Sequence, residues 1–207
     1  MPIGLTGYRI FLSWQNGLEN EKELFFETVT EFNYREGVRR EILFIPVDWR
    51  AVSKGYGRAQ SLINEELCRC DYLIILFWYR WGTPPEGEGD QGFTSGTEEE
   101  YEKAVESKNS GGNMQDIKVF FKEVAQGQKD DAGPQLQKVL EFKDKVKKEG
   151  IYEEFKNDGE FVELLRQYLS DRLYELEKMS VPKIPKTSVR DIAKVPKDMD
   201  QIEKQTK

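Results

Sequence analysis

Histidine is absent from the 207-residue sequence, and its absence removes several kinds of chemistry. Ser-His and Cys-His nucleophilic catalysis both need an imidazole base, so neither is available here. The only two cysteines, Cys68 and Cys70, do not complete a common zinc site without histidine, and we interpret them as reduced packing residues. We therefore expect no metal, and general acid–base chemistry at neutral pH falls to Glu, Asp, Lys, Cys or Tyr.

Long apolar runs are also missing. The longest one, "YLIILFWY" at 72–79, has eight residues, far fewer than the roughly 20 that cross a bilayer as a helix. The first ten residues lack the basic start, apolar stretch and small-residue cleavage site of a secretory signal. These features predict a cytoplasmic protein that does not enter a membrane.

Outside the glycine-rich loop at 82–94, no segment matches either of the common phosphate-binding glycine loops. "GLTG" at 4–7 and "KGYG" at 54–57 match neither G-x-x-x-x-G-K-[ST] nor G-x-G-x-x-G. A P-loop ATPase and a dinucleotide-binding dehydrogenase are therefore disfavoured.

Charge of one sign dominates most of the chain. The net charge is −7, and residues 179–207 carry 7 Lys/Arg against 4 Asp/Glu, so residues 1–178 carry 24 against 34. An acidic body repels a phosphate backbone, and we expect no direct nucleic-acid binding by this domain. Three prolines and many lysines indicate a linker or tail at 179–207, after an α/β domain at 1–178.

Short apolar bursts alternate with helical patterns along the domain. The bursts at 8–14, 41–47, 71–78 and 117–122 are nearly continuous in apolarity, as in parallel strands covered on both faces, and a weaker fifth lies at 150–155. Apolar stripes with helical spacing occur at 18–32, 59–70, 97–107, 134–146 and 159–179. This alternation predicts a flavodoxin-like open parallel sheet of four to five strands with flanking helices.

Three successive glutamates begin the helix expected at 97–107. Ser95 with Glu98, and Thr97 with Glu100, each match the S/T-x-x-E capping box, and acidic residues in a first turn favour the helix dipole. The helix nevertheless starts at the carboxyl edge of the sheet, where ligands bind in such folds. Glu100 precedes the core-facing Tyr101 and is the best candidate for a carboxylate that stabilises an oxocarbenium-like sugar centre.

Aromatic and arginine side chains follow the expected strands at the same edge. An aromatic ring there would stack on a base or nicotinamide, and a guanidinium would neutralise a pyrophosphate. Each such residue alone is more often a core-edge or surface residue. The candidates are Trp14, Trp49, Trp78, Tyr79 and Trp81 with Arg50, Arg58 and Arg80.

Four segments carry a resemblance to a known family. "RIFLSWQ", the run "VDWRAVSKGYGRAQSLINEELCRCDYLIILFWYRWGTP", "SGTEEEYEKA" and "IKVFFK" resemble the bacterial TIR-like domains, relatives of the Toll/interleukin receptor domain. The likeness covers about 8–175. It implies a flavodoxin-like fold and, as in many prokaryotic members, NAD cleavage in immune or signalling systems that respond to phage.

The same resemblance assigns roles to particular residues. Glu100, followed by Tyr101, occupies the place of the family's catalytic glutamate, with Glu99 and Glu98 as the next choices. Ser13 and Trp14 after the first strand, and Trp49 to Arg58 after the second, match the ligand-facing loops. The resemblance also implies NAD as substrate with no further cofactor, self-association that completes the site, and a C-terminal sensor domain or partner protein.

Two other functions remain open at this point. Many TIR domains are scaffolds that self-associate without catalysis, and this sequence fits that role too. Nucleoside deoxyribosyltransferases share the open sheet and use a glutamate on ribosyl carbons, so a nucleoside or nucleotide glycosidase is a third hypothesis.

Overall fold

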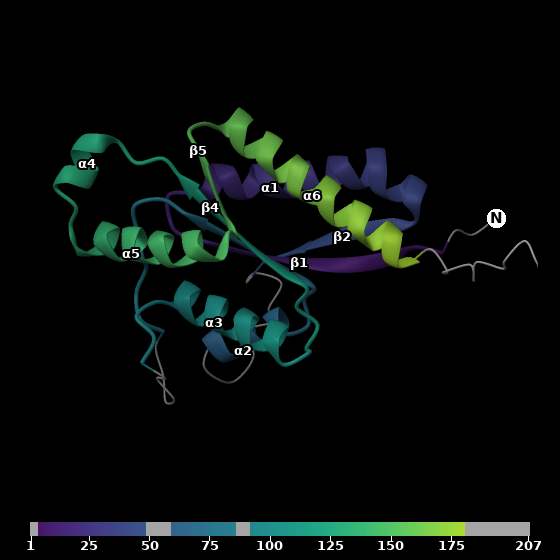
Figure 1. Ribbon diagram of the computed structural model, residues 1–207, viewed down its shortest axis with the longest axis horizontal. Coiled ribbons are helices and arrows are strands. Elements are labelled where there is room, and N and C mark those ends of the chain that lie inside the picture. The colour runs from purple at the N-terminus through teal and green to yellow at the C-terminus, as the bar shows by residue number, and fades with distance from the viewer. Residues whose placement is uncertain (1–3, 49–58, 86–91, 181–207) are drawn as a thin grey trace, which may run out of the picture.

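Five strands, all parallel, form one sheet in the order β2-β1-β3-β4-β5 (Figure 1). The computed structural model describes residues 4–48, 59–85 and 92–180. The strands are β1 (Thr6–Trp14), β2 (Ile42–Val47), β3 (Tyr72–Phe77), β4 (Asp116–Lys122) and β5 (Tyr152–Phe155). The predicted α/β fold class is confirmed, and the weak fifth strand is part of the sheet.

Helices cover both faces of the sheet (Figure 1). The first face packs on α1 (Glu19–Phe32) and α6 (Asp158–Ser180), and the second on α2 (Ala59–Leu67), α3 (Gly96–Asn109) and α5 (Pro134–Glu149). All six residues of β3 are buried, because this strand lies in the middle of the sheet between the two helical layers. Burial on both faces explains why the sequence of β3 is apolar at every position.

Three short helical elements were not predicted. The helix α1 continues into a π-helical turn at Asn33–Gly37 and a 3-10 turn at Val38–Arg40, and α4 (Gln126–Asp130) follows β4. The Asn33 side chain joins this helical extension of α1 to the sheet. Its amide donates to the C=O of Phe44 in β2 and accepts from the N–H of the same residue. At Gly37, a Cβ would lie 2.4 Å from the backbone oxygen of Ile42, so only glycine fits this approach.

The strand order changes direction between β1 and β3. β1 pairs with β2 on one side and with β3 on the other, and Ser13 and Trp14 of β1 align with Ile75 and Leu76 of β3. In open α/β sheets, ligands bind beyond the carboxyl ends of the strands at such a switch point. The fold therefore directs attention to the ends of β1 and β3.

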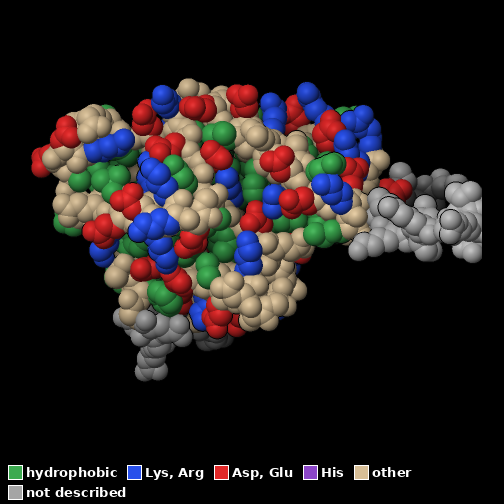
Figure 2. Space-filling view, viewed as in Figure 1, with side chains coloured by type: hydrophobic (Ala, Val, Ile, Leu, Met, Phe, Trp, Pro, Cys, Tyr) green, Lys and Arg blue, Asp and Glu red, His purple; other side chains and the backbone are tan. Residues whose placement is uncertain are grey.

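Two further features of the described residues are the distribution of surface charge and the apolarity of the helices. On the face that Figure 2 shows, acidic and basic side chains are interspersed and do not gather into one basic patch. Among the described residues, no helix is both long enough and apolar enough to cross a membrane.

Candidate functional site

Helix α3 begins beside the switch point, with Glu98 and Glu99 in its first turn and Glu100 directly after them. The N-cap is Ser95, whose hydroxyl accepts a hydrogen bond from the backbone N–H of Glu98 at 3.1 Å. The Glu98 carboxylate accepts from the backbone N–H and the hydroxyl of Thr94, at 2.6 and 2.8 Å. Glu98 is thus a capping residue, one position displaced from the reciprocal bond of a capping box.

Thr97 has a different role from the predicted second capping box. It lies inside α3, where its hydroxyl accepts a bond from the Gln15 amide at 2.7 Å and lies 3.4 Å from the Ser13 hydroxyl. Only Ser95 caps the helix, so the second match to the capping pattern was wrong.

Glu100 is buried, although it is a carboxylate at the start of a helix. Its residue is 7% exposed, and the Gln60 amide of α2 donates to it with 3.1 Å between Nε2 and Oε1. Burial raises the pKa of Glu100 above its ordinary value, while hydrogen bonds from Ser13 and Gln60 oppose this and the neighbouring Glu99 charge adds to it. A buried carboxyl with a raised pKa, held at the ligand edge of the sheet, is a typical functional-site feature.

Glu99 is also buried, but it is held by a different side chain. Its carboxylate accepts a bond from the Asn64 amide of α2 at 2.7 Å, and Asn64 in turn accepts one from Gln60 at 3.2 Å. The amides of α2 therefore hold the two successive carboxylates of α3. At Gly96, a Cβ would lie 2.7 Å from Gln60 Oε1, so the glycine leaves room for this amide.

A buried polar network ties the site to the loop after β3. Gln15, 8% exposed, donates to Thr97 and, at 3.1 Å, to the backbone oxygen of Trp81. The following Gly82 has a φ of +104°, and a Cβ there would lie 3.1 Å from Gln15 Oε1. The end of β1, the β3–α3 loop and the start of α3 are thus linked through one amide.

Trp81 belongs to the core and does not offer its ring to a ligand surface. The residue is 4% exposed and its ring stacks on Phe77 with centroids 5.5 Å apart, while Phe142 packs edge-on with its centroid 5.3 Å away. The indole N–H donates to Thr94 at 2.7 Å. The structure therefore corrects the expected stacking role of Trp81, because tertiary packing occupies this ring.

The remaining described candidates lie at the expected edge. Ser13 contacts Glu100, as stated above, and Trp14 is half-buried with Lys22 above its ring at 5.8 Å. Tyr79 packs edge-on against Trp78 with centroids 4.5 Å apart, and Arg80 lies 5.4 Å from the Tyr79 ring. Trp49, Arg50 and Arg58 lie outside the described residues, so their ligand-binding roles stay predictions.

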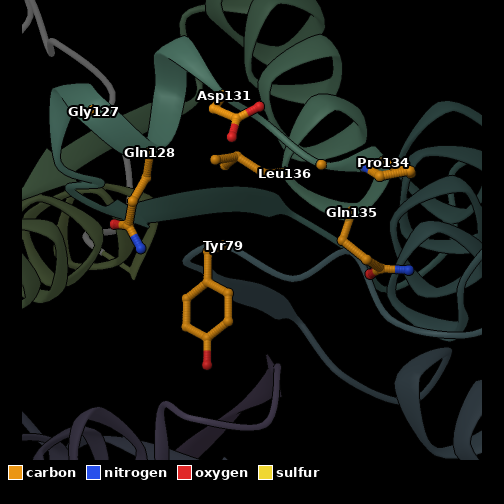
Figure 3. A pocket seen from close by; sticks show the side chains of 8 residues that line it. Tyr79, Gly127, Gln128, Asp131, Pro134, Gln135 and Leu136 are labelled. Atoms are coloured by element: carbon orange, nitrogen blue, oxygen red, sulfur yellow. The ribbon is translucent and has the colours of Figure 1, made fainter.

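Tyr79, in the loop after β3, also borders a hollow beside α4 and the start of α5, which Figure 3 shows from close by. Its volume is about 460 Å³, and its lining includes Gly127, Gln128, Asp131 and Gln135. The described residues that form it do not include Glu100. Gln135 fixes the wall, since its oxygen accepts bonds from the backbone N–H groups of Trp81 and Gly82 at 2.8 and 3.0 Å.

Sequence reasoning missed the amides that hold the carboxylates. Gln15, Gln60 and Asn64 have no motif of their own, although Gln60 and Asn64 are four residues apart on one helix, a spacing that places side chains on one face. That spacing, in a helix expected beside the Glu100 helix, was the one available signal.

The comparisons with known proteins add a family and a structural likeness. A search of curated proteins found no match. The apo crystal structure of translation elongation factor SelB from Methanococcus maripaludis is similar at a TM-score of 0.42 and 14% identity, over 83% of this chain and 36% of that chain. This chain thus spans about a third of the length of that protein, and so weak a likeness carries no functional argument. The family model of DUF4062, a domain of unknown function, matches residues 9–170, and the chain belongs to this family.

Proposed function

We propose that this domain cleaves the N-glycosidic bond of NAD, releasing nicotinamide, with Glu100 as the catalytic residue. The observation that supports this proposal is the burial of the Glu100 carboxyl at the β1/β3 switch point, where Ser13 and Gln60 hold it. A structural carboxylate gains little from such burial, since desolvation disfavours its charge.

The raised pKa of Glu100 suits a cationic substrate. The nicotinamide ring of NAD is a pyridinium, and the ribosyl centre becomes more positive as the bond breaks. A cation near a desolvated carboxylate favours the ionised form, and the interaction strengthens toward the transition state, which is the requirement for catalysis. Gln60 and Ser13 already donate to the ionised form and would keep the carboxylate oriented.

The proposed reaction balances without a metal or redox partner. The bond from the ribose C1′ to the nicotinamide nitrogen breaks, and its electron pair neutralises the pyridinium. Glu100 stabilises the ribosyl cation or captures it as an ester, and water then attacks C1′. The water proton leaves to solvent, and the products are nicotinamide, ADP-ribose and a proton.

The TIR-like resemblance supplies the biological setting of this proposal. In that setting the domain is an effector of a bacterial immune or signalling system that works as an oligomer. A domain that only assembles is the second candidate, which the acidic body and the capping of α3 by Ser95 favour, and the experiment separates the two.

A set of three isosteric variants tests the proposal. Nicotinamide release from NAD is followed over a range of protein concentrations for the wild type and for Glu98→Gln, Glu99→Gln and Glu100→Gln. Release that only Glu100→Gln removes supports the assignment, because the adjacent Glu99 is buried to a similar degree and serves as the matched control.

Two outcomes would contradict the proposal. Equal release by the wild type and Glu100→Gln removes Glu100 from the chemistry. Association with rising concentration, without turnover of NAD, indicates the assembly module instead. Nucleosides and nucleotides tested beside NAD distinguish the glycosidase or transferase hypothesis, which expects turnover of those compounds and none of NAD.

A further inference from the structure

Two side-chain amides, one helical turn apart on α2, form a hydrogen-bonded chain with the two buried carboxylates of α3. Glu99 accepts from Asn64 Nδ2 at 2.7 Å, and Asn64 Oδ1 accepts from Gln60 Nε2 at 3.2 Å. The same Gln60 nitrogen donates to Glu100 Oε1 at 3.1 Å. The chain therefore runs from Glu99 through both amides to the proposed catalytic carboxyl.

The direction of these hydrogen bonds is set at Asn64. A carboxamide has one oxygen that accepts and one NH2 group that donates two hydrogen bonds. Because the Asn64 NH2 group is turned to the Glu99 carboxylate, the Asn64 oxygen faces Gln60 and needs a donor there. Gln60 supplies one of its two N–H groups to Asn64, which leaves the other for Glu100. A reversed Gln60 amide, with its oxygen and NH2 group exchanged, would place oxygen against oxygen at Asn64.

Glu100 cannot fix the orientation of Gln60 by itself, because a carboxyl accepts when ionised and donates when protonated. Burial raises the pKa of Glu100, so its protonated form persists to higher pH than that of an ordinary glutamic acid. Besides burial, the groups of the described residues that act on this pKa are Ser13 of β1, Gln60 of α2 and Glu99 of α3. A reversed Gln60 would accept from the protonated carboxyl and so stabilise the form that does not favour a ribosyl cation.

The space beside the Gln60 amide fits the same orientation. At Gly96, the first residue of α3, an added Cβ would lie 2.7 Å from Gln60 Oε1 and 3.9 Å from Nε2. The amide oxygen is therefore the end that faces Gly96. The backbone of Gly96 does not have a positive φ, so the glycine is needed here for room and not for its conformation.

We propose that Asn64 is a positioning residue, which keeps the Gln60 amide turned toward Glu100 as a donor whether Glu100 is ionised or protonated. Its effect on catalysis rests on the proposed function, in which the oriented Glu100 carboxylate meets the ribosyl cation. Asn64 contacts Glu99 and Gln60 and acts on Glu100 through Gln60. A glutamine in place of Glu99 also offers an oxygen to Asn64, so Glu99→Gln keeps this arrangement.

Carboxyl NMR titration of the full chain tests the proposal without NAD. The 13C resonance of the Glu100 carboxyl is followed against pH for the wild type, Asn64→Leu, Gln60→Leu and the double variant. Asn64→Leu should move the Glu100 titration to higher pH, because Gln60 can then reverse and accept from the protonated carboxyl. It should have no further effect in the Gln60→Leu background, because the side chain through which it acts is gone. Ser61→Leu, at an exposed position of the same helix, is the matched control.

A second measurement on the wild type needs no variant that lowers stability. Nuclear Overhauser contacts between the Gln60 NH2 group and the Gly96 Hα are recorded above and below the pH at which Glu100 titrates. They should stay weak at both pH values, since the amide oxygen faces Gly96, whereas a reversed amide would make them strong. Strong contacts below the titration, equal titration of the wild type and Asn64→Leu, or the full shift by Asn64→Leu in the Gln60→Leu background would overturn the proposal.

Nicotinamide release by the same variants distinguishes this proposal from the proposed function. For Asn64→Leu, kcat/KM at neutral pH should fall by up to about tenfold, with the acid limb of the profile moved to higher pH. A shifted Glu100 titration without cleavage of NAD would contradict the function and support the role of Asn64. Cleavage of NAD with an unshifted titration in Asn64→Leu would contradict the role of Asn64 alone.

Discussion

Gln60 on α2 donates a hydrogen bond to Glu100 on α3, with 3.1 Å between Nε2 and Oε1. Because this bond favours the ionised carboxyl, it holds the pKa of Glu100 below the value that burial alone would give. Two segments 40 residues apart thus set the charge of the proposed catalytic group.

Gln60→Leu should therefore reduce activity most strongly on the acid side. Without the amide the pKa of Glu100 rises further, and the acid limb of the kcat/KM profile for nicotinamide release moves to higher pH. The loss at neutral pH should be about tenfold, as for one hydrogen bond to a charged group. Gln126→Leu, on exposed α4, is the control. A uniform loss at every pH would show that Gln60 has a merely structural role.

Glu100 should also change how the unfolding free energy depends on pH. The pKa of Glu100 is higher in the folded state than in the unfolded state, so its protonated form stabilises the fold. This contribution to the unfolding free energy is complete at pH values below the unfolded-state pKa, and it is lost as pH rises through the folded-state pKa. Glu100→Gln cannot ionise and should gain stability relative to the wild type as pH rises above the ordinary pKa of a glutamate. Urea unfolding at several pH values measures this difference. A difference that is constant with pH would contradict the burial argument.

Particular residues show why the sheet could be predicted from sequence while half of the site could not. Residues 72–77 are apolar at every position because helices cover both faces of β3. The continuous apolar run in the sequence therefore indicates a buried strand directly. Glu100 is a candidate because its helix directly follows that strand, and its catalytic role stays a prediction. Its partner Gln60 was not predicted, because a polar amide has no hydrophobic period and its contact depends on how α2 packs against α3.

For Trp81, the position after β3 was predicted correctly, but the surroundings of the side chain were not. The residue does lie just after β3, as expected, yet Phe77 and Phe142 enclose its ring. Phe142 is 61 positions away in α5, so local sequence could not distinguish a ligand platform from a core residue.

The environment of Trp81 leads to a clear mutational expectation. Trp81→Phe loses the bond from the indole N–H to Thr94 and leaves that buried region less well filled. The cost should be about 1–3 kcal/mol in unfolding free energy, with little change in the KM for NAD. Denaturant unfolding and initial-rate kinetics measure the two quantities. A large rise in KM with unchanged stability would restore the stacking role.

Ser95 should be a purely structural residue despite its proximity to Glu100. Ser95→Ala removes the N-cap bond to the Glu98 N–H and should cost about 1 kcal/mol of stability. Ser107→Ala, later on the same helix, should stay within about 0.5 kcal/mol of the wild type. If Ser95→Ala reduces kcat beyond the loss of folded protein, the cap also positions the carboxylates that follow it.

The hollow beside Tyr79 offers a test of how the substrate lies on the sheet edge. A Cβ at Gly127 meets no atom within 4 Å, and Gly127 lines the hollow (Figure 3). Gly127→Leu should therefore fill part of the space without a clash, and leucine favours a helix more than glycine does. If the part of NAD remote from the cleaved bond occupies the hollow, KM should rise about tenfold with kcat nearly unchanged, because binding common to ground and transition states is lost. Lys129→Leu, on α4 but outside the lining, is the matched control. An unchanged KM would place the substrate elsewhere along the edge, while leaving the role of Glu100 to be judged by its own variants.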